Sequence, residues 1–181
     1  MGKNEKKNWS WPLIAIHWLV ATAVFGLFAL GWWMVDLSYY DPWYKTGPDL
    51  HKSIGFLLFM TMVARLVMRV FTRKPAPISS HAKWEKLLAS KVHIALYLLV
   101  FLVMLSGYLI STADGRAISV FGIIDIPATI TEIENQEDIA GLIHWYAACT
   151  IIALAVLHAA GALKHHLLDK DDTLKRMLGK A

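Results

Sequence analysis

Cysteine is almost absent from this sequence of 181 residues, which contains a single residue of that type, Cys149. One cysteine excludes an internal disulfide and any metal site built from several cysteines. Cys149 lies within an apolar run, so we expect it to be a small buried hydrophobic residue. The chain also lacks internal repeats and low-complexity tracts, and its length is that of one domain. We therefore expect a single domain over residues 1–181.

Charge is also scarce, since only 18% of the residues are charged whereas 56% are hydrophobic. A soluble domain of this size carries more charge and less apolar bulk. A helix of about 20 apolar residues crosses the roughly 30 Å hydrocarbon core of a bilayer. The sequence therefore predicts an all-α fold, an integral membrane four-helix bundle, with a polar loop before the last helix. The expected spans are residues 13–35, 51–71, 92–112 and 139–163.

Basic residues cluster on one side of these spans. Fifteen of the 18 Lys and Arg residues lie in the N-terminal flank, the connection between the second and third spans, and the C-terminal flank, when Arg65 and Arg69 are counted with the connection. The other flanks hold three basic residues and nine of the 14 acidic ones. Because positive loops stay in the cytoplasm, both termini are predicted there. The net charge of +4 then reflects topology and contacts with membrane lipid, and we expect no nucleic-acid partner.

Four histidines match one another by depth within these spans. Ionisable residues inside a membrane are costly and tend to be functional. His144 and His158 are 14 residues apart, so they share one helix face within roughly 40° but lie about 21 Å apart along the axis. They cannot bind one metal ion, but they could bind two stacked cofactors. Depth pairs His158 with His17 on the inner side and His144 with His51 on the outer side.

Paired intramembrane histidines point to haem, because neutral imidazole is a common ligand of haem iron. Two histidines fill both axial positions and leave no open site for oxygen. We therefore predict two b-type haems, with iron held by His17 and His158 and by His51 and His144. The alternative is that these histidines only form hydrogen bonds to neighbouring helices, which would make their matching depth and face a coincidence.

The second span carries further candidate haem contacts. Arg65 and Arg69 follow His51 by 14 and 18 residues and therefore share its helix face. We expect them to bind the anionic haem propionates. The alternative is that they extend to the lipid headgroups, which is about equally favoured for Arg69. Gly55, one turn after His51, could admit a porphyrin or simply allow close helix packing.

The remaining histidines give weaker signals. His93, near the inner end of the third span, could bind a propionate, contact a quinone, relay protons or be a plain interfacial histidine. His165 could also relay protons near the inner haem, although His165 and His166 could both be interfacial. His81, in a loop, is assigned no role.

Several short segments resemble one known family. They are IHWLV at 16–20, HKSIGFLLFMTMVARLVMR at 51–69, HIALYLL at 93–99, FGIIDIP at 121–127 and HHLLDKDDTLKRML at 165–178. Together with residues 144–158 they are similar, in order and over nearly the whole chain, to the bacterial cytochrome b561 family. The resemblance implies a dihaem protein of the bacterial inner membrane that exchanges electrons with the quinone pool. It also implies that His17, His51, His144 and His158 are the haem ligands.

The resemblance leaves two functions open. One branch of the family is a superoxide:ubiquinone oxidoreductase, which oxidises superoxide at the outer face and passes the electron through both haems to ubiquinone. In that case Lys52, beside His51, could attract the anion, although the outer flanks hold six more acidic than basic residues. The other function is an electron-transfer subunit or partner of a respiratory enzyme complex, with the acidic outer loop docking a basic periplasmic redox protein. A haem-free bundle is a weaker third alternative.

Overall fold

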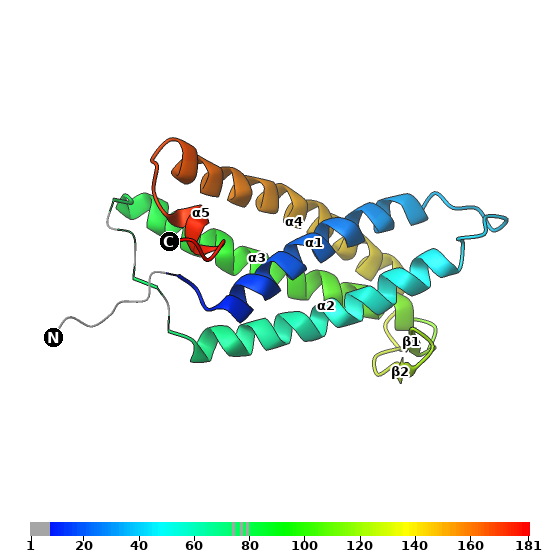
Figure 1. Ribbon diagram of the computed structural model, residues 1–181. Helices are drawn as coiled ribbons and strands as arrows, with labels where there is room; N and C mark the ends of the chain where they lie inside the picture. Colours follow the sequence, from blue (N-terminus) through cyan, green and yellow to red (C-terminus); the bar gives the residue numbers. More distant parts are fainter. Residues whose placement is uncertain (1–7, 74, 77, 79) are drawn as a thin grey trace.

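The computed structural model describes residues 8–73, 75, 76, 78 and 80–181. Within that part of the chain, four long helices dominate (Figure 1). They are α1 (Trp11–Met34), α2 (Thr46–Phe71), α3 (Lys83–Thr112) and α4 (Gln136–Leu167). Each is long and apolar enough to cross a membrane, so the predicted all-α membrane bundle is confirmed. Helices α2, α3 and α4 extend beyond the expected spans, because polar residues continue each helix past its apolar run.

The starts of these helices follow from local sequence. Pro12 occupies the first turn of α1, where a backbone N–H has no acceptor within the helix, so the missing N–H of proline costs no hydrogen bond. Ser10 precedes the helix in an extended conformation. At the start of α3, the Glu85 carboxylate accepts a hydrogen bond of 2.9 Å from the Ala82 backbone N–H. The Gln136 side chain donates to two backbone carbonyls, one near the end of α3 and one in the loop before α4. The start of α4 is therefore tied to the end of α3.

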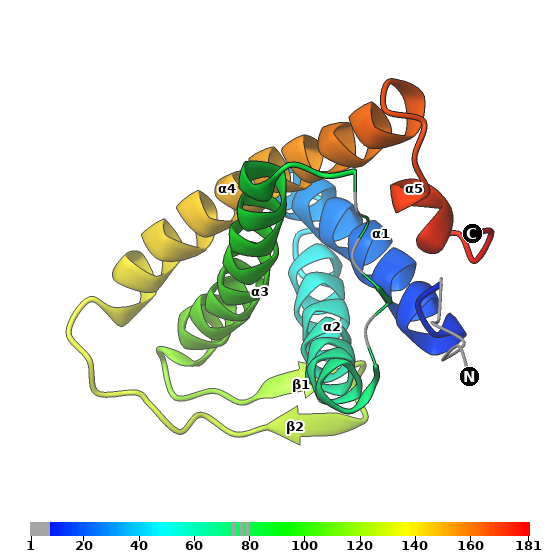
Figure 2. The ribbon, with the colours of Figure 1, turned by 90° about the vertical axis from the view of Figure 1, so that its left-hand side faces the viewer.

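The helices pack as two antiparallel pairs. Helix α1 packs extensively along α2, and α3 along α4, whereas contacts between the two pairs are fewer. The start of α1, the end of α2, the start of α3 and the C-terminal segment lie at one end of the bundle, called here the terminal end (Figure 1). The α1–α2 connection and a small β-hairpin lie at the opposite end, called here the β-hairpin end (Figures 1 and 2).

The packed interior lies midway along the helices. Leu58 and Met62 of α2, Val100 of α3 and Ile151 of α4 are buried together. Large apolar side chains on the outer faces remain exposed along every helix. Examples are Leu19 at 58%, Val67 at 50%, Leu98 at 67% and Leu157 at 65%. Such extensive apolar exposure is unfavourable in water but matches lipid hydrocarbon, so these faces contact the bilayer.

A short β-hairpin occupies the connection where the sequence predicted only a polar loop. Strands β1 (Ile118–Val120) and β2 (Ile124–Ile126) pair in antiparallel fashion. In the turn, Phe121 and Gly122 have φ values of 51° and 69°, a region that costs a glycine little. The Phe121 backbone N–H donates to the Ser53 hydroxyl at 3.0 Å. This bond fastens the hairpin to α2, two residues after His51.

The C-terminal segment folds back onto the bundle. Helix α5 (Thr173–Arg176) follows α4 and lies near the start of α1 (Figure 2). The indole Nε1–H of Trp18 donates to the Met177 carbonyl at 2.9 Å. The Arg176 guanidinium donates to the Ala76 carbonyl. The C-terminal segment is thus bound both to α1 and to the α2–α3 connection.

Candidate functional site

Two histidines face each other at the β-hairpin end. The rings of His51 on α2 and His144 on α4 have centres 6.2 Å apart and planes inclined by 61°. The Nδ1 atom of His51 is buried and has no hydrogen-bond partner among the described residues. Because α2 and α4 belong to different helix pairs, these two histidines bridge the two halves of the bundle.

A second pair lies nearer the terminal end. The ring centres of His17 on α1 and His158 on α4 are 6.3 Å apart, with planes inclined by 79°. His93 of α3 also lies beside His158, with its ring centre 5.0 Å from that of His158. This second pair also connects the two helix pairs, and His93 is its close neighbour.

The spacing within each pair fits one iron between two imidazoles. A metal–nitrogen bond of about 2 Å, with the nitrogen roughly 1.2 Å from its ring centre, sets two imidazoles on opposite sides of one ion ~6.4 Å apart. The observed separations of 6.2 and 6.3 Å agree with that value. The 5.0 Å between His93 and His158 is too short for the same arrangement. The ring separations therefore suit two haems, each between two histidines, with His93 as a neighbour of one pair.

Ser106 contacts one ring nitrogen of His144. The Ser106 hydroxyl donates to the Val103 carbonyl at 3.0 Å and lies 3.2 Å from His144 Nδ1. With the hydroxyl proton directed at the Val103 carbonyl, the hydroxyl can accept the Nδ1–H of His144, in the tautomer that leaves Nε2 unprotonated. That is the form in which imidazole binds a metal ion. Ser106 is only 2% exposed, so water does not compete for this contact.

Two glycines let His51 and His144 pack directly against neighbouring backbone. A Cβ at Gly31 would lie 3.2 Å from His51 Cε1, and one at Gly107 would lie 3.1 Å from His144 Cε1. Both distances are too short for an ordinary carbon–carbon contact. Neither glycine could be recognised from the sequence, which pointed to Gly55 instead, where an added Cβ would meet no described atom within 4 Å apart from its chain neighbours and its own helix backbone.

Arg65 is held inside the bundle beside the second pair. Its Nε–H donates to the Tyr97 hydroxyl at 3.0 Å and its Nη1 donates to the Leu13 carbonyl at 2.9 Å. Its Nη2 lies 3.4 Å from His17 Nδ1. These protein partners disfavour an arginine that extends to the lipid headgroups. A propionate contact for Arg65 stays a prediction.

Arg69 lies one turn further toward the terminal end. Its guanidinium carbon is 5.5 Å from the centre of the Trp9 ring and 5.9 Å from that of Tyr97. A guanidinium over aromatic faces is stabilised by cation–π attraction. Arg69 is therefore oriented by aromatic neighbours, and its propionate contact also stays a prediction.

The two histidine pairs are separated by the apolar interior. Ile151 lies seven residues after His144 and seven before His158, about 10 Å from each along α4. It is buried against residues of α2 and α3. The packed layer keeps water and ions out of the space between the pairs.

Lys52 is paired within its own helix. Its Nζ lies 2.8 Å from the Asp49 carboxylate, and its side chain is 32% exposed. The carboxylate offsets part of the positive charge that the sequence suggested beside His51. Any local attraction of an anion by Lys52 is correspondingly weaker.

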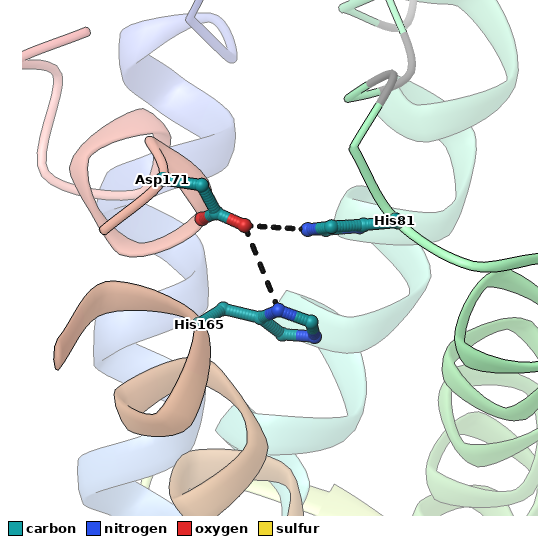
Figure 3. Close-up of side chains that lie close together, drawn as sticks. All are labelled: His81, His165 and Asp171. Carbon is teal, nitrogen blue, oxygen red and sulfur yellow. Dashed lines mark hydrogen bonds and ion pairs between the residues drawn. The ribbon is translucent and has the colours of Figure 1, made fainter. Parts of the chain in front are cut away.

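His165 belongs to a polar cluster at the terminal end, about 10 Å along α4 from His158. Its Nδ1 lies 2.7 Å from the Asp169 carboxylate and 3.5 Å from that of Asp171. His81, to which the sequence gave no role, stacks on His165 with ring centres 4.2 Å apart and contacts Asp171 at 2.6 Å (Figure 3). No local motif could reveal this cluster, because 90 residues separate His81 from Asp171.

The carboxylates of this cluster are strongly acidic. Burial raises the pKa of Asp171, but hydrogen bonds from Thr173 and His81 outweigh burial and lower the pKa to about 2. A hydrogen bond from Lys164 lowers the pKa of Asp169, with a smaller contribution from His165. Both side chains are therefore ionised at neutral pH.

Sequence comparisons match nearly the whole chain to known proteins. The profile of the family described as "Prokaryotic cytochrome b561" matches residues 8–180. "Cytochrome b561 homolog 2" of Escherichia coli K12 is 55% identical over 167 residues, which cover 92% of this chain and 89% of that protein. "Probable superoxide oxidase CybB" of Yersinia pestis is 28% identical over 179 residues, covering 96% and 97%. "Cytochrome b561 homolog 1" of Escherichia coli K12 is 27% identical over 169 residues, covering 91% and 93%.

Proposed function

Because the chain belongs to the prokaryotic cytochrome b561 family of membrane electron-transfer proteins, we propose that it is a dihaem cytochrome carrying electrons from superoxide to ubiquinone. The observation that carries this proposal is the presence of two histidine pairs, with ring centres 6.2 and 6.3 Å apart. They lie on either side of an apolar interior. The spacing suits two irons, and the separation suits transfer from one leaflet to the other.

In this proposal, His51 and His144 hold one haem, and His17 and His158 hold the other. Haem iron supplies reversible one-electron transfer when bound. With a histidine on each side, the iron would have no open position for a substrate, so the haems would only pass electrons. Arg65 and Arg69 are the proposed partners of the propionates.

Orientation follows from the charged flanks. The terminal end carries most of the basic residues, so it faces the cytoplasm of a bacterial inner membrane, with both termini inside. Four lysines that enter this count, Lys3, Lys6, Lys7 and Lys74, lie outside the described residues. The pair of His51 and His144 is then the outer pair, and that of His17 and His158 the inner pair.

The overall conversion balances with two superoxide anions for each quinone. Each superoxide loses one electron and becomes dioxygen, while one ubiquinone gains two electrons and two protons and becomes ubiquinol. His93, beside His158 at 5.0 Å, is the proposed carrier of protons from the cytoplasmic side. Lys52 is the proposed local attractor of superoxide, weakened by its pair with Asp49. The role of His165 as a second proton carrier stays a prediction.

The relative named as a probable superoxide oxidase supports superoxide as the donor, although at only 28% identity. A second candidate function is electron transfer with a protein donor. It is favoured by the exposed carboxylates of the β-hairpin end, which would attract a basic periplasmic partner. These are Asp125, Glu132, Glu134, Glu137 and Asp138.

The deciding experiment follows the haem spectrum of the oxidised, detergent-purified protein under a steady superoxide flux. We expect two haems per chain, rapid reduction, reoxidation by added ubiquinone, and loss of the reduction when superoxide dismutase is present. Full reduction by dithionite but none by superoxide would contradict the superoxide donor and favour the protein donor. A colourless protein, purified with ample haem supply, would contradict both.

A further inference from the structure

Two histidines and a carboxylate converge at the terminal end, apart from both histidine pairs. His81 precedes α3, His165 lies in the last turn of α4, and Asp171 lies between α4 and α5 (Figure 3). Their side chains are 17%, 16% and 8% exposed. They are sheltered, yet reachable from water. Neither His81 nor Asp171 has a part in the proposed electron transfer.

The donor atoms of these three side chains are close enough to share one ion. His81 Nε2 and His165 Nδ1 lie 2.6 and 3.5 Å from the same Asp171 oxygen, and all three atoms lie within 4.8 Å of one another. A tetrahedral ion with bonds of about 2.0–2.1 Å holds its ligand atoms roughly 3.3–3.4 Å apart. The rings already stack at 4.2 Å with planes inclined by only 29°. Binding one tetrahedral ion would separate the ring centres by about 1 Å, to roughly 5.2 Å, while the three donor atoms stay within reach of one another.

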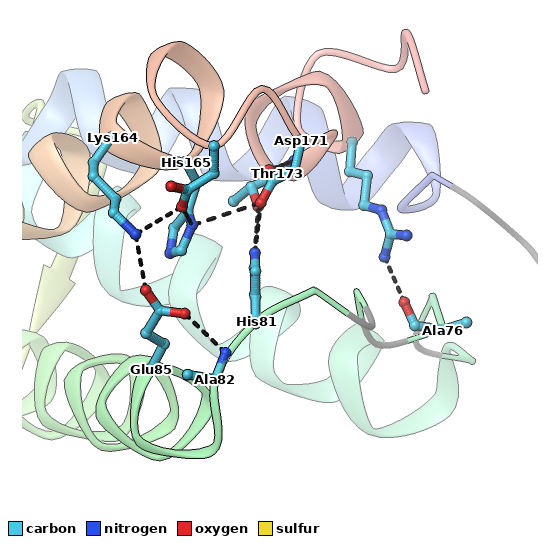
Figure 4. Close-up of polar contacts among 10 residues, drawn as sticks. Ala76, His81, Ala82, Glu85, Lys164, His165, Asp171 and Thr173 are labelled. Atoms are coloured by element: carbon cyan, nitrogen blue, oxygen red, sulfur yellow. Dashed lines mark hydrogen bonds and ion pairs between the residues drawn. The ribbon is translucent and has the colours of Figure 1, made fainter.

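The neighbouring lysine does not occupy this position. The Lys164 ammonium is bound by the carboxylates of Glu85 at 2.8 Å and Asp169 at 2.7 Å (Figure 4). These two carboxylates form a second grouping with His165. Because the Lys164 ammonium already occupies the position between them and offsets one of their two charges, that grouping is a poor cation site. The Asp171 carboxylate is paired with the two imidazoles.

The chemistry of the donors selects the class of ion. Two imidazole nitrogens and one carboxylate oxygen suit zinc and similar divalent ions, whereas calcium and magnesium prefer oxygen ligands alone. We propose that His81, His165 and Asp171 form a binding site for a divalent transition-metal ion such as zinc. The ion would fasten the start of α3 and the C-terminal segment to the end of α4. This site does not depend on the proposed electron transfer.

The test uses the full-length, haem-loaded protein, purified without a histidine tag and treated with a chelator. Zinc is titrated calorimetrically into the wild type, His81→Gln, Asp171→Asn and the control His166→Gln, which replaces the neighbouring histidine. We expect one zinc per chain in the wild type and the control. The affinity should fall at least about tenfold in the other two variants. Haem content and size-exclusion profiles of the same samples show whether each variant is folded.

A measurement on the wild type alone avoids dependence on the variants. X-ray absorption at the zinc edge should report two imidazoles and an oxygen ligand, and it is distinct from any iron signal. Three results would each overturn the proposal: no stoichiometric zinc binding, unchanged affinity in folded His81→Gln and Asp171→Asn, or a spectrum without imidazole ligands. Haem content that does not change with the chelator or with zinc separates this site from the histidine pairs.

Discussion

Adding one methyl group at Gly107 should disturb the outer histidine pair and leave the inner pair unchanged. The new Cβ of Gly107→Ala would lie 3.1 Å from Cε1 and 3.3 Å from Nδ1 of His144. An ordinary contact of about 3.5 Å requires a displacement of roughly 0.4 Å. The ring cannot move freely, because Ser106 holds its Nδ1 and the proposed iron holds its Nε2.

The expected change in stability on replacing Gly107 by alanine can be compared with that at a glycine in open space. Replacing glycine by alanine in a helix interior stabilises by about 0.5–1 kcal/mol, whereas overpacking costs about 1–3 kcal/mol. Gly107→Ala should therefore destabilise the protein by about 0–2.5 kcal/mol. The control is Gly26→Ala in α1, an exposed position where no described residue lies within 4 Å of the added Cβ. It should be neutral or slightly stabilising.

Redox titration followed by absorbance distinguishes the two haems. In Gly107→Ala we expect one component to shift in potential or to be lost, and the other to match the wild type. In Gly26→Ala both components should be unchanged. If Gly107→Ala keeps two haems with wild-type spectra and potentials, then His144 is not both a haem ligand and in contact with α3, and the reasoning fails.

Three further changes test other parts of the site. His144→Ala should remove mainly the outer haem, measured as haem per chain. The control His166→Ala, on the same helix, should keep both haems. Retention of both haems in His144→Ala would contradict the ligand assignment. Ser106→Ala removes the acceptor for His144 Nδ1–H, so the imidazole donates less electron density. The reduction potential of the outer haem should then rise by at most roughly 60 mV, which corresponds to one hydrogen bond of about 1.5 kcal/mol. A fall in the potential would contradict the assigned hydrogen bond. Ser53→Ala removes the bond to Phe121 and should lower thermal stability by about 1 kcal/mol, with haem content retained; an unchanged melting temperature would show that the β-hairpin is held by its apolar contacts alone.

The membrane helices and the depth of the histidines could be predicted because both depend on one helix at a time. A fixed rise per residue converts sequence position directly into depth. This is why residues matched by depth, such as His17 with His158, lie side by side in the structure. Their role as haem ligands stays a prediction.

Contacts that depend on how neighbouring helices are rotated could not be predicted. Gly55 satisfied the expected spacing on its own helix, but the glycines in contact with imidazoles are Gly31 and Gly107, on other helices. The β-hairpin was missed for another reason. Its strands are only three residues long, too short for an alternating pattern to be distinguished from a loop.

Helix α3 packs against α4 in a register that places supporting residues beside both histidine pairs. It provides neither member of either histidine pair, yet His93 lies beside His158 and Gly107 lies against His144. His93 and Gly107 are 14 residues apart on α3, and His144 and His158 are also 14 residues apart on α4. Because α3 and α4 are antiparallel neighbours, this equal spacing brings both supporting residues to their histidines in a single register. A slip of one helical turn between α3 and α4 would remove both contacts together, so the close packing of these two helices maintains the surroundings of both proposed haems.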